Sequence, residues 1–444
     1  MKYRRQAIIL LLVFALFLGE LFSTPQPAHA AVSLPPLWDT AWTLNLSNQT
    51  TINTYLTARK SQEFDAVLMG FGDFGARNTA LGNGATPFLG TVPSSVANVS
   101  DVLKPNAAGW SYIDSTLSSA RDKGLTVGFL PLGNGGATTY VDALKDRYSG
   151  ENRAYKYGVW LGNRYKNAKN FIWVLGGDVN PNEDPAVVTL TNSLASGIRS
   201  TGDSHPMTFQ PSNSGTNSVH SSSYNFNSQS WLTFNSIQST PLDPGTITHD
   251  IALNKPTGVL ETGYEGKYTS SDILKFTWQA YFSGATYMTY GQTDMYQGQN
   301  AANTNGIKYS KIARDLVVSR GWLSYTPTSD FITSKSSTVA SMRKSNSAAM
   351  IYLGSDASAT VDMSKLNANT SVTVQCLDPT TGNVTTVSTY PASGTQSLTG
   401  GGLSNAVLLL DASAATGETT PPPPTTTFPA MRGCLEVTKT DIPE

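Results

Sequence analysis

Residues 171–178 read FIWVLGGD, and this stretch decides the fold of the chain. Five apolar residues are followed by two glycines and one carboxylate, Asp178. An unbroken apolar run of this length that ends at glycine predicts a strand buried on both faces. The glycines allow the backbone to turn, which places Asp178 at the carboxyl end of the strand, where parallel α/β barrels hold their catalytic groups. An aspartate that only caps the next helix explains the local pattern equally well.

Seven further runs have the composition of strands, and helical patterns separate several of them. Apolar residues recur at helical spacing around Trp110, Tyr157, Leu274 and Tyr309. Alternating strands and helices predict a parallel sheet. Eight such units predict an α/β fold, a (β/α)8 TIM barrel, over residues 31–330. The seven runs cover residues 37–42, 64–70, 125–132, 206–210, 231–237, 256–263 and 285–291.

The pattern changes at residue 331, where short alternating runs replace the strand–helix units. They predict a small antiparallel β-sandwich over residues 331–412. Residues 413–444 are rich in Pro and Thr and predict a linker and a tail. The only two cysteines, Cys376 and Cys434, fall in these different segments, so the question of their pairing stays open. The alternating runs lie at 338–343, 348–353, 371–377 and 406–410.

The first thirty residues have the features of a secretory signal peptide. Lys2, Arg4 and Arg5 form a basic start, residues 7–18 are apolar, and residues 28–30 (AHA) provide a small-x-small cleavage site. No later apolar run is long enough to span a bilayer. We therefore expect a secreted, extracellular protein that has no membrane association after cleavage.

The composition indicates a neutral partner. Charged residues make up 14% of the chain and the formal net charge is −1, whereas average domains contain about 25% charged residues. No basic surface is expected, which argues against nucleic acid as a partner. A surface rich in hydroxyls, amides and aromatic rings suits a polysaccharide or oligosaccharide substrate.

Two patterns that suggest a cofactor or a metal lack the context that these ligands need. Residues 70–75 fit G-x-G-x-x-G, but loop-forming residues follow, whereas a dinucleotide site needs a helix to begin there. Three histidines follow the leader, His205, His220 and His249, and none has the spacing of a zinc motif. We expect no cofactor and no metal.

Glu261 repeats the position of Asp178 at the end of an apolar strand, in the run PTGVLETG at 256–263. The two side chains would then converge across the mouth of the barrel. Glycoside hydrolysis needs such a pair, with one carboxyl protonated to assist the leaving oxygen and the other ionised. A separation of about 5–5.5 Å is typical of retention of configuration, and about 6.5–9.5 Å of inversion. Alternatively, Glu261 or Glu265 only braces the rim through hydrogen bonds, and this interpretation is favoured for Glu265.

Other residues near strand ends are candidates for contact with a sugar. Asp39 and Asp73, near the ends of the first and second strands, can hydrogen-bond to hydroxyl groups. Aromatic side chains near strand ends can stack on sugar rings, but packing in the core explains any one of them equally well. These aromatic residues are Trp38, Trp42, Tyr264 and Tyr290.

Several stretches of the chain resemble the apiosidase-like glycoside hydrolases. This barrel family often carries a small C-terminal domain labelled collagen-binding. The helix that leads into IWVLGGD is the most specific of the matching stretches. The resemblance implies a secreted barrel hydrolase that acts on plant cell-wall or similar polysaccharides. The stretches are WDTAW (38–42), YGVWLGNRYKNAKNFIWVLGGD (157–178), HPMTF (205–209), WLTFNSIQS (231–239), ETGYEG (261–266), TYG (289–291) and CLDPTTG (376–382).

The resemblance also implies roles for individual residues. Asp178 matches the acid/base and Glu261 the nucleophile of a retaining double displacement. We expect His205, Asn235 and Glu265, which lie in matching stretches, to join the substrate-binding residues.

Three positions depart from the family pattern. Gln210 stands in place of a second His, Thr240-Pro241 in place of a Gly-His pair, and Met295-Tyr296 in place of an apolar–Trp pair. Because these positions are expected to face substrate, the resemblance does not extend to specificity for apiose.

Two alternatives from other classes remain open. The chain could be a catalytically silent glycan- or matrix-binding protein with the C-terminal sandwich as the binder, or a non-hydrolytic barrel enzyme such as a lyase or a transglycosylase. Sugar binding without turnover would support the first. Products with an unsaturated ring or a new linkage would support the second.

Overall fold

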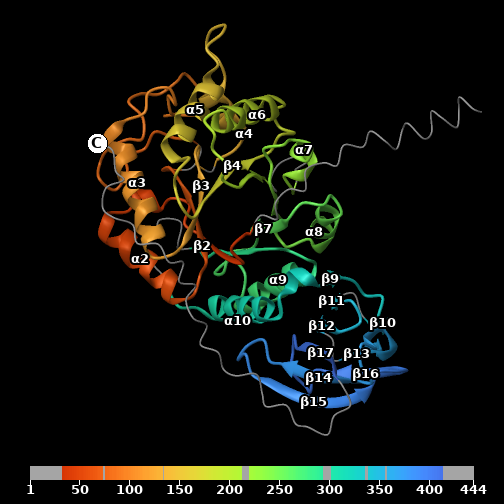
Figure 1. Cartoon of the computed structure of the whole chain (residues 1–444). Coiled ribbons are helices and arrows are strands. Elements are labelled where there is room, and N and C mark those ends of the chain that lie inside the picture. Colours follow the sequence, from red (N-terminus) through yellow and green to blue (C-terminus); the bar gives the residue numbers. More distant parts are fainter. Residues whose placement is uncertain are drawn as a thin grey trace, which may run out of the picture.

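A computed structural model describes residues 33–73, 76–133, 135–212, 220–293, 302–335, 339–355 and 358–413 (Figure 1). Eight parallel strands form a nearly closed barrel with helices around it, which confirms the predicted fold class. All eight predicted strands are present, although the run at 231–237 forms a strand only from Asn235 onward. The strands are β1 (Leu37–Thr40), β2 (Ala66–Gly70), β3 (Thr126–Leu130), β4 (Phe171–Val179), β5 (Met207–Pro211), β6 (Asn235–Gln238), β7 (Thr257–Glu261) and β8 (Met288–Tyr290).

The barrel closes between β5 and β6 with few hydrogen bonds. The strand order is β5-β4-β3-β2-β1-β8-β7-β6, so these two strands form the seam. The backbone N–H of Thr233, just before β6, donates to the carbonyl of Met207 over 2.9 Å. The hydroxyl of Thr208 donates to the carbonyl of Phe234 over 2.9 Å. Side-chain hydrogen bonds therefore supplement the few backbone hydrogen bonds between β5 and β6.

Side chains alternate between the barrel interior and the helical layer, as the two-residue period of a strand requires. The interior holds a buried cluster that includes Trp38, Leu68, Leu260 and Tyr287. The rings of Trp38 and Tyr287 lie 4.9 Å apart between centroids. A Cβ at Gly128, in the middle of β3, would lie 2.7 Å from the Trp38 ring. Glycine is therefore required at this position of an otherwise apolar strand.

Four helices stand where the apolar spacing predicts them: α3 (Ala107–Asp122), α5 (Arg153–Tyr165), α9 (Ser270–Phe282) and α10 (Asn305–Arg320). At the start of each of these helices, a polar side chain accepts a hydrogen bond from a backbone N–H group of the first turn. At α9, Thr269 and Asp272 form a reciprocal capping box. The other helices are α2 (Gln49–Ser61), α4 (Ala137–Leu144), α6 (Ala186–Arg199), α7 (Ser223–Phe226) and α8 (Pro244–Ile251), with a short 3-10 turn η1 (Leu44–Leu46) after β1.

The strands after the barrel form two antiparallel sheets, as predicted for this part of the chain. Their orders are β15-β14-β17-β12-β11-β9 and β10-β13-β16. A buried cluster that includes Phe331, Ile351, Val374 and Leu408 fills the space between them. The strands are β9 (Thr326–Pro327), β10 (Ile332–Ser334), β11 (Ala340–Lys344), β12 (Ala348–Tyr352), β13 (Ser358–Asp362), β14 (Ser371–Leu377), β15 (Val384–Pro391), β16 (Thr395–Thr399) and β17 (Val407–Ser413).

The larger sheet also packs against the barrel, so it is apolar on both faces. Tyr352 of β12 stacks on Trp278 of α9 with ring centroids 6.3 Å apart. The Arg320 guanidinium of α10 donates to Asp411 of β17 over 2.6 Å. Figure 1 shows the two sheets beneath α9 and α10. The C-terminal sheets are thus joined to the barrel by a continuous apolar core.

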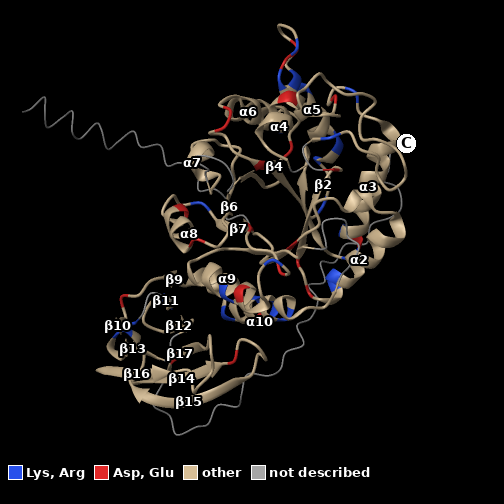
Figure 2. Ribbon diagram, turned by 180° about the vertical axis from the view of Figure 1, so that it is seen from behind, with Lys and Arg blue, Asp and Glu red and all other residues tan. Residues whose placement is uncertain are grey.

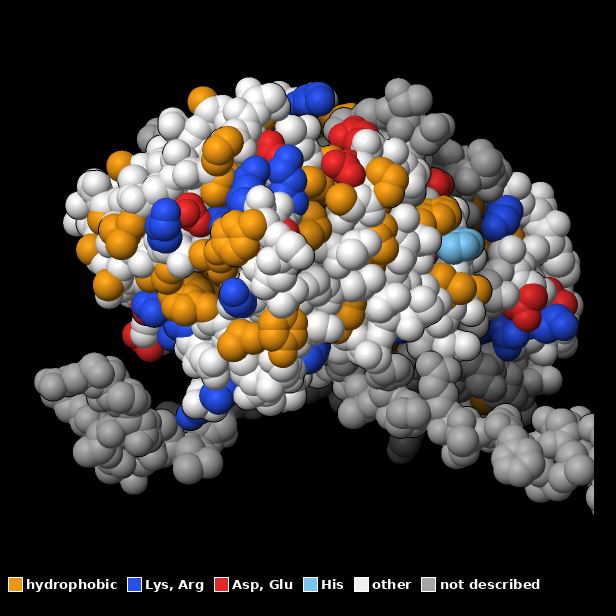
Figure 3. All heavy atoms as spheres, turned by 90° about the horizontal axis from the view of Figure 1, so that it is seen from above, with side chains coloured by type: hydrophobic (Ala, Val, Ile, Leu, Met, Phe, Trp, Pro, Cys, Tyr) orange, Lys and Arg blue, Asp and Glu red, His pale blue; other side chains and the backbone are white. Residues whose placement is uncertain are grey.

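Charge is sparse on the molecule. In Figure 2, Lys and Arg lie mainly on outer helices and loops, α10 among them. The face in Figure 3 consists mostly of uncharged side chains and backbone atoms. Within the described ranges, no helix is long and apolar enough to cross a bilayer.

Some sequence-based predictions lie outside the described residues. These are the signal peptide, the tail beyond Ser413, Cys434 and the Met295-Tyr296 pair. Cys376, in β14, is a buried free thiol.

Candidate active site

Asp178 lies at a bulge at the carboxyl end of β4. The ladder with β5 pairs Gly176 with Gln210 and resumes only at Val179, which leaves Gly177 and Asp178 as extra residues. Three consecutive residues have positive φ, 82° at Gly176, 111° at Gly177 and 53° at Asp178. This conformation costs a residue with a side chain about 1–2 kcal/mol, and such strain gathers at functional sites. The two glycines therefore allow the turn that presents Asp178 at the mouth.

A second bulge turns Glu261 into the mouth of the barrel. Ile237 of β6 pairs with Val259 and the adjoining Gln238 pairs with Glu261, so β7 contains one extra residue at this point. Strict alternation would direct Glu261 toward the helices, because its neighbour Leu260 belongs to the interior cluster. Bulges next to active sites re-aim side chains in this way.

Two glutamines connect the carboxylates to other strands. Gln210, near the end of β5, donates from Nε2 to Oε2 of Glu261 over 2.7 Å. Gln238, at the end of β6, donates from Nε2 to Oδ1 of Asp178. One contact joins β5 to β7 and the other joins β6 to β4. The two contacts therefore overlap along the part of the barrel formed by β4 to β7.

The groups around Glu261 have opposing effects on its pKa. The Tyr264 hydroxyl donates to Oε1 of Glu261 over 2.9 Å, and Trp42 Nε1 donates to that hydroxyl oxygen over 2.7 Å. Burial raises the pKa of Glu261 well above its ordinary value and the charge of Asp178 raises it further, whereas the hydrogen bonds from Tyr264 and Gln210 lower it. Asp178 is therefore near enough for its charge to act on Glu261.

Glu265 stabilises the rim through hydrogen bonds, which is the interpretation favoured from the sequence. Its carboxylate accepts hydrogen bonds from Ser270, Tyr290 and Thr304, each over 2.5 Å, and from the backbone N–H of Gly306 over 3.0 Å. Burial by itself raises the pKa of Glu265, but these four donors together hold it below its ordinary value. Glu265 and Tyr290 therefore support the loops of the rim. The buried Tyr290 is wrong as a predicted substrate contact, whereas contact of Glu265 with substrate stays a prediction.

Trp38 and Asp39 also lie away from the mouth, because β1 alternates its faces. Trp38 is fully buried inside the barrel. Asp39 is fully buried in the helical layer, where Arg59 Nε donates to its Oδ2 over 2.7 Å and the Tyr55 hydroxyl donates to the same oxygen. The prediction that these two residues contact a sugar is therefore wrong.

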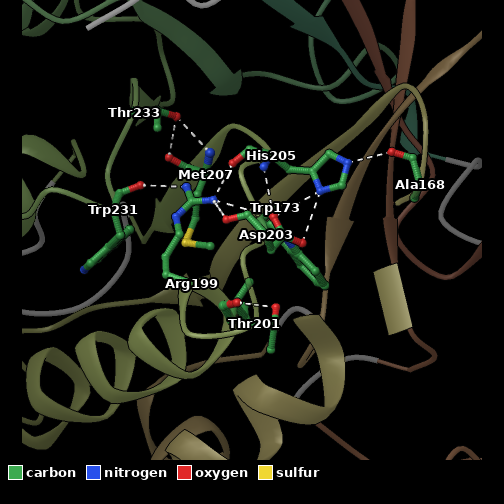
Figure 4. A network of polar contacts seen from close by, with 10 residues as sticks. Ala168, Trp173, Arg199, Thr201, Asp203, His205, Met207, Trp231 and Thr233 are labelled. Atoms are coloured by element: carbon green, nitrogen blue, oxygen red, sulfur yellow. Dashed lines mark hydrogen bonds and ion pairs between the residues drawn. The ribbon is translucent and has the colours of Figure 1, made fainter. Parts of the chain in front are cut away.

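His205 and Asn235 lie at the amino ends of their strands, opposite the two carboxylates. His205 Nδ1 is 3.1 Å from an oxygen of Asp203, and its Nε2 is 2.6 Å from the carbonyl of Ala168 (Figure 4). Burial by itself lowers the pKa of His205, but these two acceptors hold it above its ordinary value. Asn235 begins β6 and is fully buried on the face that carries Ile237. Their predicted contact with substrate is wrong as well.

Three predicted contacts remain at the carboxyl end of the barrel. Trp42 and Tyr264 adjoin Glu261, and both are buried. Asp73 follows β2, is partly exposed, and accepts a hydrogen bond from the Thr79 hydroxyl over 3.1 Å. Within the described residues, no three His, Cys, Asp or Glu side chains are placed to hold a metal ion.

Gln238 was not predicted as a site residue, and Gln210 was expected to face substrate only as a departure from the family pattern. Both could have been found by the signal that indicated the two acids. Each is a polar side chain at the end of a predicted strand, in PMTFQ at 206–210 and just after WLTFNSI at 231–237.

Comparisons with known proteins agree with this fold and with a glycoside hydrolase. The sequence matches the family described as "Apiosidase-like, catalytic domain" over residues 35–334. A solved structure described as "Glycoside hydrolase" is 18% identical with a TM-score of 0.71, over 86% of this chain and 93% of that one. A glycoside hydrolase family 5 protein from Bacteroides vulgatus ATCC 8482 is 19% identical with a TM-score of 0.70, over 85% and 90%. Among curated proteins, none matches.

The two structural likenesses establish the fold, and the family match establishes the class. The matched residues include both bulges, both acids and both bridging glutamines. The alternative of a catalytically silent binding protein therefore loses its support. The chain belongs to the apiosidase-like family and is a glycoside hydrolase.

Proposed function

We propose that the protein cleaves glycosidic bonds in plant cell-wall or similar polysaccharides by a retaining double displacement. Asp178 acts as the acid/base and Glu261 as the nucleophile. The observation that carries the proposal is the placement of both carboxyl groups at the carboxyl end of the barrel, each bound by a glutamine. Burial there, and then the charge of Asp178, raises the pKa of Glu261. A retaining glycosidase needs a carboxyl pair with one proton between its members.

The hydrogen bonds around Glu261 support its assignment as the nucleophile. Trp42 N–H donates to the oxygen of Tyr264, so the hydroxyl proton of Tyr264 is directed to Glu261. The amide of Gln210 donates to the other carboxylate oxygen. Donors on both oxygens favour the ionised form. Burial and the charge of Asp178 nevertheless raise the pKa of Glu261, so the assignment requires that the proton of the pair lies on Asp178 when substrate is bound.

The reaction then proceeds in two steps. Asp178 donates its proton to the glycosidic oxygen while Glu261 attacks the anomeric carbon, and the leaving group departs as an alcohol. Asp178, now ionised, takes a proton from water, and the water oxygen displaces Glu261 from the sugar. Each step inverts the anomeric carbon, so the overall configuration is retained.

Rescue by azide tests the two assignments on an aryl glycoside that the protein hydrolyses. With Glu261→Gly, azide takes the place of the carboxylate, and we expect a glycosyl azide of inverted configuration. With Asp178→Gly, Glu261 still forms the covalent intermediate, and we expect an azide of retained configuration. Glycine suits the positive φ at Asp178, so that variant keeps the fold. An exchange of the two products would reverse the roles, and unchanged hydrolysis by either variant would remove that acid from the mechanism.

We further infer that the protein is secreted, which brings it to polysaccharides outside the cell. The basic start, the apolar stretch and the small-x-small site within residues 1–30 support this inference. Sequencing of the amino terminus of protein recovered from culture medium is expected to begin at Ala31. Cell-retained protein that still begins at Met1 would contradict it.

A further inference from the structure

Several buried amide side chains at the carboxyl end of the barrel have an atom without a hydrogen-bond partner among the described residues. A buried polar atom without a partner destabilises the folded chain. A group of such atoms at one end of a barrel therefore marks a place where a ligand supplies the partners. The atoms are Asn45 Oδ1, Asn180 Nδ2, Gln210 Oε1, Gln238 Oε1 and Gln292 Oε1.

Gln210 and Gln238 are the two amides that also contact the reacting acids. Gln210 is fully buried and Gln238 is 3% exposed. Each directs its N–H at a carboxylate, since the reverse orientation would set a carbonyl oxygen against that carboxylate. The two carbonyl oxygens are thereby left as acceptors beside the pair. A sugar hydroxyl, which donates one hydrogen bond, is a suitable partner for each of them.

The charges at this end of the barrel favour an uncharged sugar. As far as the structure describes them, none of the three residues that follow each barrel strand is Lys, Arg or His. Asp73, Asp178 and Glu261 lie at this end instead. His220, whose Nδ1 lies 3.3 Å from the backbone carbonyl of Gln238, is the titratable base next to these amides. A carboxylate or sulfate group on the substrate would meet the negative charge of the three acids. Hydroxyl groups fit amides and carboxylates without that penalty.

We propose that Gln210 and Gln238 each bridge one reacting carboxylate and one hydroxyl of the glycosyl unit at the cleavage point, and thereby select a neutral sugar over a uronic or sulfated one. This rests on the proposed function, because Asp178 and Glu261 are taken as the reacting pair.

Binding of sugars that resist cleavage tests the proposal without turnover. The probes are the methyl thioglycosides of arabinose, xylose, galactose, glucose and glucuronic acid, measured by isothermal titration calorimetry. We expect at least one neutral probe to bind, and glucuronide to bind at least about 10-fold more weakly. Gln210→Met and Gln238→Met should each weaken the neutral probe by about 10-fold or more. For each variant, that loss should disappear on the mono-deoxy analogue that lacks the contacted hydroxyl.

Gln49→Met is the matched control. Its amide hydrogen-bonds to Ser115 and Ser119 on the outer helices, so this variant should bind like the wild type. Thermal unfolding checks every variant, and Gln210→Leu and Gln238→Leu repeat the test if a Met variant does not fold. Equal binding of glucuronide, unchanged binding by both glutamine variants, or no binding of any neutral probe overturns the proposal. Failure of the proposed function is distinguishable, because it shows as hydrolysis by Glu261→Gly, whatever the glutamine variants bind.

Discussion

Acids at the two ends of the barrel have different kinds of partner. At the amino end, Asp203 accepts hydrogen bonds from the indole of Trp173 and from His205, and Arg199 lies 3.6 Å away (Figure 4). Burial by itself raises the pKa of Asp203, but its contacts with His205 and Trp173 hold that pKa below the ordinary value. This acid is therefore stabilised in its charged form and contributes to folding.

At the carboxyl end, the donors described above are neutral. Gln210 and Tyr264 donate to Glu261, and Gln238 donates to Asp178. No cation is among these donors. Burial and the charge of Asp178 outweigh their hydrogen bonds, so the pKa of Glu261 is raised. The two acids differ in their neighbours: His205 and Arg199 lie beside Asp203, whereas a second acid, Asp178, lies near Glu261 and raises its pKa further. The following experiments test that distinction.

The largest effect is expected for Glu261→Gln. We expect kcat to fall by about 10⁴-fold or more, because an amide can neither attack the anomeric carbon nor carry the charge. The free energy of unfolding should stay equal or increase, since a buried acid with a raised pKa is replaced by a neutral group of the same shape. Kinetics and urea unfolding measure the two quantities. A large loss of stability with little loss of kcat would show that Glu261 only braces the rim.

A smaller but substantial effect on stability is expected for Arg59→Met. Asp39 and Arg59 are both fully buried in the helical layer, and removal of one partner of a buried ion pair costs about 3–5 kcal/mol. The free energy of unfolding should fall accordingly, while kcat of the folded enzyme at low temperature should not change. Arg343→Met is the control, because its partner Asp330 is half exposed and such pairs contribute about 0–1 kcal/mol. Equal losses in the two variants would contradict the assigned role of Asp39.

The smallest of these effects is the pH dependence due to His205. Its pKa is raised in the folded state, so its contribution to stability is fully present below the unfolded pKa of about 6.5 and is lost as the pH rises through the folded pKa. Urea unfolding between about pH 5.5 and 8.5 should show this decline. His205→Gln should make the decline less steep, and the raised pKa of Glu261 adds a decline of the same sign that Glu261→Gln should remove. A slope that is the same in His205→Gln as in the wild type would contradict the role of His205.

The barrel was predictable because its signals are local. Apolar runs that end in glycine or in a polar residue predicted the strands, and helical spacing predicted four of the helices. The same patterns failed for Trp38, Asp39 and Tyr290. A strand directs alternate side chains to opposite faces, and nothing near these residues says which face is the interior. His205 and Asn235 failed for another reason, because they begin their strands at the end of the barrel opposite Asp178.

The sequence by itself determined the alternation of strands and helices, the class of enzyme through its family pattern, and the two acids that end β4 and β7. Only the tertiary structure decided how these acids are placed at the carboxyl end of the barrel. The bulges at Asp178 and Glu261 are properties of the ladders with β5 and β6, and those ladders join segments far apart in the chain. The contacts of Gln210 and Gln238 likewise reach from β5 to β7 and from β6 to β4. Such contacts depend on how a closed barrel sets its strands side by side, which no local pattern encodes.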